Sequence, residues 1–373
     1  MPIQTSDNKF GTARWIVDPV AGLGTHTTIA AAITSASAGE TIFIRPGTYT
    51  ENLTLKVGVN LVSYESDYLQ GQVIIRGKCS HTTTGTVVIS GIRLQTNSDY
   101  FLSITGTLAS VVQLVDCFLD ALDNAGIEFT STHASASIEA ISCTGNIGAA
   151  AIAFFTATSP GTIRFAYCTI RNTGGSTTRS TSSAGNITFF HSTIEFPITL
   201  SGTGSGFALY TNFNTSSQNI VTFIHNGTGG AYNFLDCKFD SGTAIGVTVG
   251  AGATVEFNGN TCINTSNASL TDGAGTLDYD IVTATTLGSQ ALGTTTLSPN
   301  SVFISRAPTV TALTSGSGAT YTVPTGAKWL KVCMIGAGGG GGSSGTTPGA
   351  ATNGGNTTFG ALTASGGVGV TAA

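Results

Sequence analysis

The sequence predicts an all-β protein built as a parallel β-helix, and three observations support this. Six short phrases between positions 115 and 265 vary one pattern: VDCFLD, ISCTGN, AYCTIR, HSTIEF, LDCKFD and NTCINT. Their small anchor residues recur at spacings of 26, 25, 24, 45 and 25: Cys117, Cys143, Cys168, Ser192, Cys237 and Cys262. A unit of about 25 residues holds three short strands with their turns, which is one coil of a solenoid.

The interval of 45 residues predicts two coils, with Asn212 as a weak middle anchor. Coils of a solenoid stack at about 4.8 Å, so equivalent positions form columns along its axis. Small anchors suit a narrow interior, and we expect the six of them to form a structural core ladder. The position three residues after an anchor is usually polar, as a turn leaving the core should be: Asp120, Asn146, Arg171, Glu195 and Asp240.

The repeat also sets the domain organisation. Residues 1–40 are expected to form a leader and a capping helix, with Thr27 or Thr28 as N-cap and the helix running through Ala38 to Gly39. Residues 41–267 are predicted to form the β-helix. Residues 268–327 have β composition without the repeat and are interpreted as a connector. Residues 328–373 form a glycine-rich C-terminal module.

Composition excludes several classes of function. Charged residues make up 9% of the 373-residue chain, against roughly 25% in ordinary domains. The net charge is −5, the 14 basic residues form no cluster, and nucleic-acid binding is therefore not expected. No apolar run reaches the roughly 18 residues of a membrane span. The opening MPIQTSDNKF lacks the pattern of a secretory signal.

Metal and nucleotide cofactors are not expected either. The seven Cys and five His residues form no CxxC, HExxH or mixed cluster, and laddered thiols are more typical of a reduced core. Gly336, Gly338 and Gly341 imitate a dinucleotide fingerprint after an apolar stretch. That chemistry needs a following helix and an acidic residue, and Asp280 is the last acid in the chain.

A resemblance to a known superfamily is carried by AAITSASAGETIFIRPGTYTENLTLKVGVNLVS. This stretch is similar to the opening of pectin-lyase-like right-handed β-helices, which include pectinesterases and many phage tailspikes. The resemblance implies a right-handed coil. The GxxDFIFG-like and LGRPW-like blocks that carry pectinesterase chemistry are absent, so the fold is implied and the activity is not.

A second resemblance lies at the C-terminus, in VPTGAKWLKV, the glycine run and NTTFGALTASGG. These segments resemble the glycine-rich modules of phage tail fibres and adhesins, in which glycine tracts pack as polyglycine helices and exposed loops contact the host. The two resemblances together imply a fibre or tailspike-like homotrimer that recognises host-cell surface polysaccharide. Its location would be a virion tail fibre or an extracellular fibre. A bacterial surface adhesin of the same shape is an equal alternative.

Two sets of residues are candidates for a site. Asp116, Asp120, Asp236 and Asp240 flank equivalent anchors, and a polysaccharide depolymerase on this scaffold would use a carboxylate pair. The simpler interpretation is that they are solvated turn residues. Aromatic residues with a polar rim could stack on sugar rings: Tyr64, Tyr68, Tyr100, Tyr210 and Tyr232.

Overall fold

The computed structural model describes residues 15–64, 72–149, 153–178, 180–218, 220–227, 229–242, 246–250, 252–265, 270–272, 276–284, 295–304, 331–341 and 349–370. Contacts divide the chain into two compact units, Met1–Val310 and Thr311–Ala373. Each unit is described by itself. In the described residues, no helix has the length and hydropathy needed to cross a bilayer.

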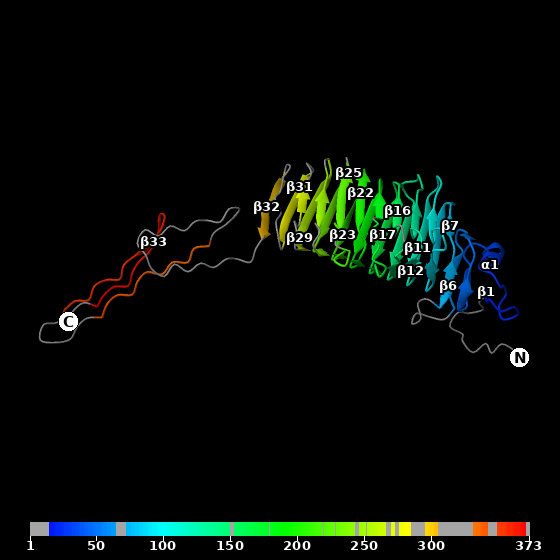
Figure 1. Ribbon diagram of the computed structural model, residues 1–373, viewed down its shortest axis with the longest axis horizontal. Coiled ribbons are helices and arrows are strands. Elements are labelled where there is room, and N and C mark those ends of the chain that lie inside the picture. The colour runs from blue at the N-terminus through cyan, green and yellow to red at the C-terminus, as the bar shows by residue number, and fades with distance from the viewer. Residues whose placement is uncertain are drawn as a thin grey trace. The chain divides into compact units, whose positions relative to one another are not determined.

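The first unit is a parallel β-solenoid whose strands stack in three columns along one axis (Figure 1). Each coil contributes one short strand to each of three faces. Face 1 consists of β1 Trp15–Val17, β2 Thr41–Ile44, β5 Asn60–Ser63, β8 Gly85–Ser90, β11 Ser110–Val115, β14 Ser137–Ile141, β17 Thr162–Ala166, β20 Asn186–Phe190, β23 Ser205–Leu209 and β26 Ala231–Leu235.

Face 2 follows face 1 after a two-residue corner in the repeated coils. Its strands are β3 Gly47–Tyr49, β6 Val73–Arg76, β9 Arg93–Gln95, β12 Phe118–Ala121, β15 Thr144–Ile147, β18 Thr169–Arg171, β21 Thr193–Ile194, β24 Asn212–Asn214 and β27 Lys238–Gly242. Three longer strands pair along both columns: β29 Thr254–Thr265, β31 Thr276–Ala284 and β32 Thr295–Ile304.

Face 3 is a sheet of ten described strands: β4 Leu53–Thr54, β7 Cys79–His81, β10 Leu102–Ile104, β13 Ile127–Phe129, β16 Phe155–Ala157, β19 Ser180–Ser182, β22 Ile198–Gly202, β25 Phe223–Gly227, β28 Val247–Val249 and β30 Leu270–Asp272. Every described pairing between coils is parallel, which requires each chain segment to pass over the previous one in the same sense. The predicted all-β parallel β-helix is therefore confirmed.

The core is a continuous column of aliphatic and aromatic side chains. Phe165 and Phe189 stack with ring centroids 5.4 Å apart, and Phe234 stacks on Phe257 at 5.3 Å. Burying each such side chain stabilises the fold by about 1.5–3 kcal/mol. Since each coil alone cannot cover its apolar side, the stability of the solenoid comes from contacts between coils.

The corner between faces 1 and 2 explains the anchor residues. The residue before each anchor adopts a left-handed conformation, with φ between 45° and 58°: Asp116, Ser142, Tyr167, His191, Tyr210 and Asp236. This conformation is unfavourable for L-residues by about 1–2 kcal/mol. The anchor side chain donates a hydrogen bond across the corner to the carbonyl two residues earlier, as Cys117 does to Val115 at 3.4 Å and Ser192 does to Phe190 at 2.7 Å.

The same bond recurs at Cys143, Cys168, Thr211 and Cys237. In the coil before Cys117, Ile92 occupies the anchor position, and its side chain has no hydrogen-bond donor. There the left-handed residue is Gly91, with φ 69°, for which this conformation carries no steric cost. In these coils, a non-glycine residue in the left-handed position is always followed by an anchor whose side chain donates a hydrogen bond.

Strand register corrects two anchors of the predicted ladder. Thr193 pairs with Asn212, so the middle anchor is Thr211 and not Asn212, one residue earlier than expected. Lys238 pairs with Cys262, so Cys262 is one position out of line with Cys237. The other five predicted ladder residues are buried: Cys117, Cys143, Cys168, Ser192 and Cys237.

The expected segment boundaries also change. Residues 15–17 were assigned to a leader, yet β1 pairs in parallel with β2. The parallel ladder does not end at 267, because β29 pairs with β31 and β31 with β32. The hydrophobic repeat fades there while backbone pairing continues, since a ladder needs only backbone groups. Much of the predicted connector 268–327 lies outside the described residues.

Helix α1, Ile29–Ser35, precedes the second coil, and it is shorter than the predicted helix. Thr28 is its N-cap and accepts the N–H of Ala31 at 3.3 Å. The Glu51 carboxylate accepts the N–H groups of Ile29 and Ala30 at 2.9 and 3.0 Å, which satisfies donors at the positive end of the helix. The covering of the open solenoid end by this helix stays a prediction.

In the second unit, three segments, 331–341, 349–356 and 365–370, form a ring of backbone hydrogen bonds. Ala337 donates to Gly355, Gly354 to Gly367, and Gly367 back to Ala337. Further bonds are displaced by three residues, from Gly340 to Thr352 and from Ala351 to Val370. These hydrogen bonds recur with a three-residue period, which is also the period of polyproline II-type helices.

Glycine is required at the contacts between these segments. A Cβ at Gly336, Gly339 or Gly354 would collide with a carbonyl of a neighbouring segment. The hairpin of β33 Thr357–Phe359 and β34 Leu362–Ala364 joins the last two segments. Within 331–341 and 349–370 no helix occurs, and the residues that directly follow Gly341 lie outside the described part of the chain.

We predict that His225 makes the solenoid less stable in acid. His225 is buried, its Nε2 donates to Gly230 O at 3.0 Å, and its Nδ1 accepts the Gly227 N–H at 3.3 Å. Burial lowers the pKa of His225, so the unfolded chain takes up the proton first. Stability should therefore be full above about pH 6.5 and fall below it by up to about 1.4 kcal/mol per pH unit.

Denaturant midpoints measured at pH 7.5 and 5.5 check this expectation. The difference between the two should shrink in His225→Gln and persist in His133→Gln, where the replaced side chain is half-buried and accepts the Ser135 N–H at 3.1 Å. An equal shift in wild type and His225→Gln would contradict it.

Candidate functional site

The corner column carries an exposed ladder of aromatic rings. The column of left-handed residues runs Asp116, Ser142, Tyr167, His191, Tyr210 and Asp236 in successive coils. Tyr167 and His191 stack with centroids 5.3 Å apart and planes 12° apart, and His191 lies 5.0 Å from Tyr210. Tyr167 is 63% exposed and Tyr210 52%. The left-handed backbone is what directs these side chains away from the core.

Face 1 adds apolar side chains beside this ladder. Phe207 is 41% exposed and Leu235 37%, and the Phe207 ring meets the edge of Phe190 at 4.9 Å. Phe190 and Leu235 directly precede corner residues, so they adjoin the ring ladder. We name Tyr167, Phe190, His191, Phe207, Tyr210 and Leu235 the aromatic patch.

Two shallow depressions lie on either side of Phe207. One, of about 480 Å³, is lined by hydroxyl and amide groups as well as Phe207: Thr162, Asn186, Thr188, Ser205, Gly206 and Ala231. The other, of about 500 Å³, is more apolar and includes Leu209, Asn233, Leu235 and Asn258. Both depressions are open to solvent, so a ligand lying in them would keep one side exposed.

Gly206 allows its own strand to lie close to the backbone of Ile187 in the preceding coil. A Cβ on Gly206 would collide with the carbonyl oxygen of Ile187. In the next coil its register partner is Tyr232, which is fully buried. The Tyr232 ring packs in the core against Phe223 and Phe234, with ring centroids 4.8 Å from each.

The four candidate carboxylates form two couples, Asp116 with Asp120 and Asp236 with Asp240, and each couple lies within one coil. Asp116 and Asp236 lie in the corner column with four coils between them, which separates them by about 24 Å at the ordinary coil spacing. Asp120 and Asp240 lie equally far apart on face 2. A glycosidase pair stands roughly 5–9.5 Å apart, so carboxylates from different couples cannot act together.

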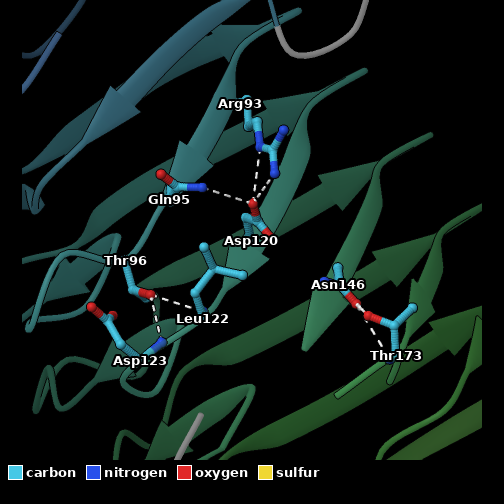
Figure 2. A network of polar contacts seen from close by, with 8 residues as sticks. All are labelled: Arg93, Gln95, Thr96, Asp120, Leu122, Asp123, Asn146 and Thr173. Carbon is cyan, nitrogen blue, oxygen red and sulfur yellow. Dashed lines mark hydrogen bonds and ion pairs between the residues drawn. The ribbon is translucent and has the colours of Figure 1, made fainter. Parts of the chain in front are cut away.

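Asp120 is not a solvated turn residue, which corrects the simpler interpretation. It is fully buried on face 2, where Arg93 pairs with its Oδ2 through both Nε and Nη2 and Gln95 donates to the same oxygen at 3.0 Å (Figure 2). Its Oδ1 is buried without a hydrogen-bond partner among the described residues. Asp120 is therefore the buried partner of an ion pair whose other member, Arg93, is partly exposed.

Similar polar contacts join neighbouring coils beside this pair (Figure 2). Thr96 Oγ1 accepts the N–H groups of Leu122 and Asp123 at 2.8 and 3.2 Å. Asn146 Oδ1 accepts the hydroxyl of Thr173 at 2.5 Å. These bonds tie the loops after face 2 to the coil before or after them. No group of three or more His, Cys, Asp or Glu among the described residues is arranged to hold a metal ion.

The five candidate tyrosines are scattered. Tyr210 belongs to the aromatic patch, whereas Tyr232 is fully buried and cannot contact a ligand, because its ring packs in the core against Phe223 and Phe234. Tyr64 is half-buried against Phe43 and lies under the Arg45 guanidinium. Tyr100 is half-buried. Tyr68 lies outside the described residues.

The sequence contained a signal for the residues that were missed. Reading the position before each anchor gives Tyr167, His191 and Tyr210 as one column. Placing the middle anchor at Asn212 instead of Thr211 shifted that coil by one residue and removed Tyr210 from the column. Phe207 carries no such signal, because its exposure depends on the local register of face 1.

Comparisons with known proteins give little beyond fold. No protein-family model matches the chain, and no curated protein is similar to it in sequence. Among solved structures, the chain is similar to pectin methylesterase from carrot, with 12% identity and a TM-score of 0.38, over 68% of this chain and 82% of that one. We transfer no residue role from that enzyme.

The ion pair on face 2 should respond asymmetrically to substitution. Arg93→Gln leaves the buried Asp120 carboxylate without its cation and should destabilise the solenoid by about 3–5 kcal/mol. Asp120→Asn leaves a guanidinium whose side chain is 32% exposed, and should cost about 1 kcal/mol. Denaturant midpoints of both variants check this, and a larger loss in Asp120→Asn would contradict the assignment.

Proposed function

We propose that this chain is a fibre or tailspike-like protein that binds polysaccharide on a host-cell surface. The observation that carries the proposal is the aromatic patch, an exposed ring ladder with two depressions beside it. Tyrosine and histidine rings present an apolar surface with a polar rim, which suits the faces and hydroxyl groups of sugars. An exposed apolar surface of this kind on a soluble protein marks an interaction site.

The scaffold supports the same proposal. The ring ladder is fixed by strand register in three successive coils, so no side-chain search or loop ordering precedes binding. A polysaccharide is itself repetitive and can lie along a solenoid that repeats at a similar scale. With 9% charged residues, the chain depends on hydroxyl and amide groups for polar contacts, as hydrogen bonding to neutral sugar hydroxyls requires.

We further propose that the active form is a homotrimer, in a virion tail fibre or another extracellular fibre. Three copies of one weak site convert later binding events into intramolecular ones and raise the overall affinity without new contacts. The glycine-rich unit offers a second exposed surface, the hairpin with Phe359 and Leu362, which by resemblance to fibre modules would also contact the host.

Removing the rings of Tyr167 and Tyr210 should abolish much of the binding without unfolding the protein. Glycine is the replacement of choice, because Gly91 already occupies this column and glycine accepts the left-handed backbone. Tyr167→Gly and Tyr210→Gly should each weaken binding to a printed array of bacterial and plant polysaccharides by roughly tenfold. Melting temperatures should stay at or near the wild-type value.

Tyr100→Ala is the matched control and should bind as wild type does. Unchanged binding in the double variant Tyr167→Gly, Tyr210→Gly would remove the aromatic patch as the site. Loss of binding in Phe359→Ala, Leu362→Ala with the patch intact would place recognition in the glycine-rich unit instead.

The homotrimer predicts a native mass three times that of one chain. Native mass spectrometry or light scattering measures it directly. Detection of the monomer alone at micromolar concentration would contradict the trimer while leaving the polysaccharide site open to test.

A further inference from the structure

We infer that the aromatic patch contains a subsite for an acidic sugar, and that Arg164 recognises its negative charge. The inference rests on the proposed function, because it names the chemical class of one unit in the bound polysaccharide. It concerns the depression with the hydroxyl and amide lining, on the side of Phe207 nearer to β17.

Arg164 is exposed and held in place. It points outward from β17, and its guanidinium carbon lies 4.7 Å from the centroid of the Phe190 ring. A guanidinium over an aromatic face is attracted by the ring while its N–H groups stay free to donate in its plane. None of the ion pairs formed by described residues includes Arg164, so no carboxylate of the described chain neutralises it by direct contact.

Strand register places Arg164 at the rim of this depression. It lies two residues after Thr162 on the same outward side of β17, and it is the register partner of Thr188. Thr162 and Thr188 both line the depression. A ligand seated there would therefore meet the guanidinium at one edge and the exposed Phe207 ring at the other.

The chemistry of the lining matches one kind of sugar. Hydroxyl and amide groups from Thr162, Asn186 and Ser205 can exchange hydrogen bonds with sugar hydroxyls, and the Phe207 ring can cover an apolar sugar face. The planar fork of an arginine binds a carboxylate or a sulfate through two parallel hydrogen bonds. A sugar bearing either group uses all three features of this subsite.

Glu139 provides a second test of the subsite, because its carboxylate would repel an acidic sugar. It is the register partner of Arg164 in the preceding coil. Gln113, in the coil before Glu139, donates to Glu139 Oε2 at 3.0 Å. The Glu139 carboxylate thus has a neutral hydrogen-bond partner and lies beside the subsite. Its removal should strengthen the binding of an acidic sugar.

The test uses the full-length protein on a printed array of neutral, carboxylated and sulfated polysaccharides. We expect the strongest binding to acidic polysaccharides, and its weakening with added salt. Arg164→Gln should lower that binding roughly 10- to 100-fold, and Arg164→Lys, which keeps the charge without the planar fork, should restore part of it. Glu139→Gln should raise it about two- to fivefold. The response to carboxylated against sulfated members identifies which acid is recognised.

Arg171→Gln is the matched control, because it removes the same charge from the same coil on face 2, where Arg171 is exposed. Its binding should equal that of the wild type. Equal binding of acidic polysaccharides by wild type and Arg164→Gln would overturn the subsite. So would a wild-type protein that binds neutral polysaccharides alone, although the proposed function would then stand.

Two other outcomes distinguish a failure of the acidic-sugar subsite from a failure of the proposed polysaccharide binding. Absence of all polysaccharide binding by the wild type would remove the proposed function, and the subsite with it. A change of native mass in Phe207→Ser would show that this face lies between copies of the chain, which would overturn the subsite while the Tyr167 and Tyr210 variants test the rest of the patch.

Discussion

The hydrogen bond from an anchor side chain to the carbonyl two residues earlier governs the repeated coils. It closes the corner between faces 1 and 2 around a residue in the left-handed conformation, which is unfavourable for any residue except glycine. Because Cys, Ser and Thr all supply a small donor, the anchor can vary among them. The exception at Gly91 and Ile92 follows the same logic, since a glycine corner needs no compensation.

The site is a consequence of that corner. A left-handed residue points outward, and when the strands on both sides are locked in register, successive left-handed residues line up along the axis. In three coils these residues are Tyr167, His191 and Tyr210, and the result is a rigid ring ladder. The rings needed for binding therefore reduce stability, because glycine would adopt the left-handed backbone of these positions at a lower conformational free energy.

The polar residues of face 2 have a different role from the one their positions first indicate. Asp120 occurs where turns leave the core, but the neighbouring coil supplies Arg93 and Gln95 directly against it, and the carboxylate is buried. Position along one coil could not reveal this, because the partners lie about 25 residues away in sequence. Contacts between coils decided that Asp120 stabilises the stack rather than faces solvent.

The sequence by itself determined the solenoid, its period and most of its buried ladder, because a column of anchors needs similar side chains at regular intervals. It also contained the ring column, readable at the position before each anchor once Thr211 is placed correctly. Only the tertiary structure decided that correction, the extension of parallel pairing to Ile304, the burial of Tyr232 and the exposure of Phe207. The physical reason is that register between coils is a property of backbone pairing, which side-chain identity in a single coil does not encode.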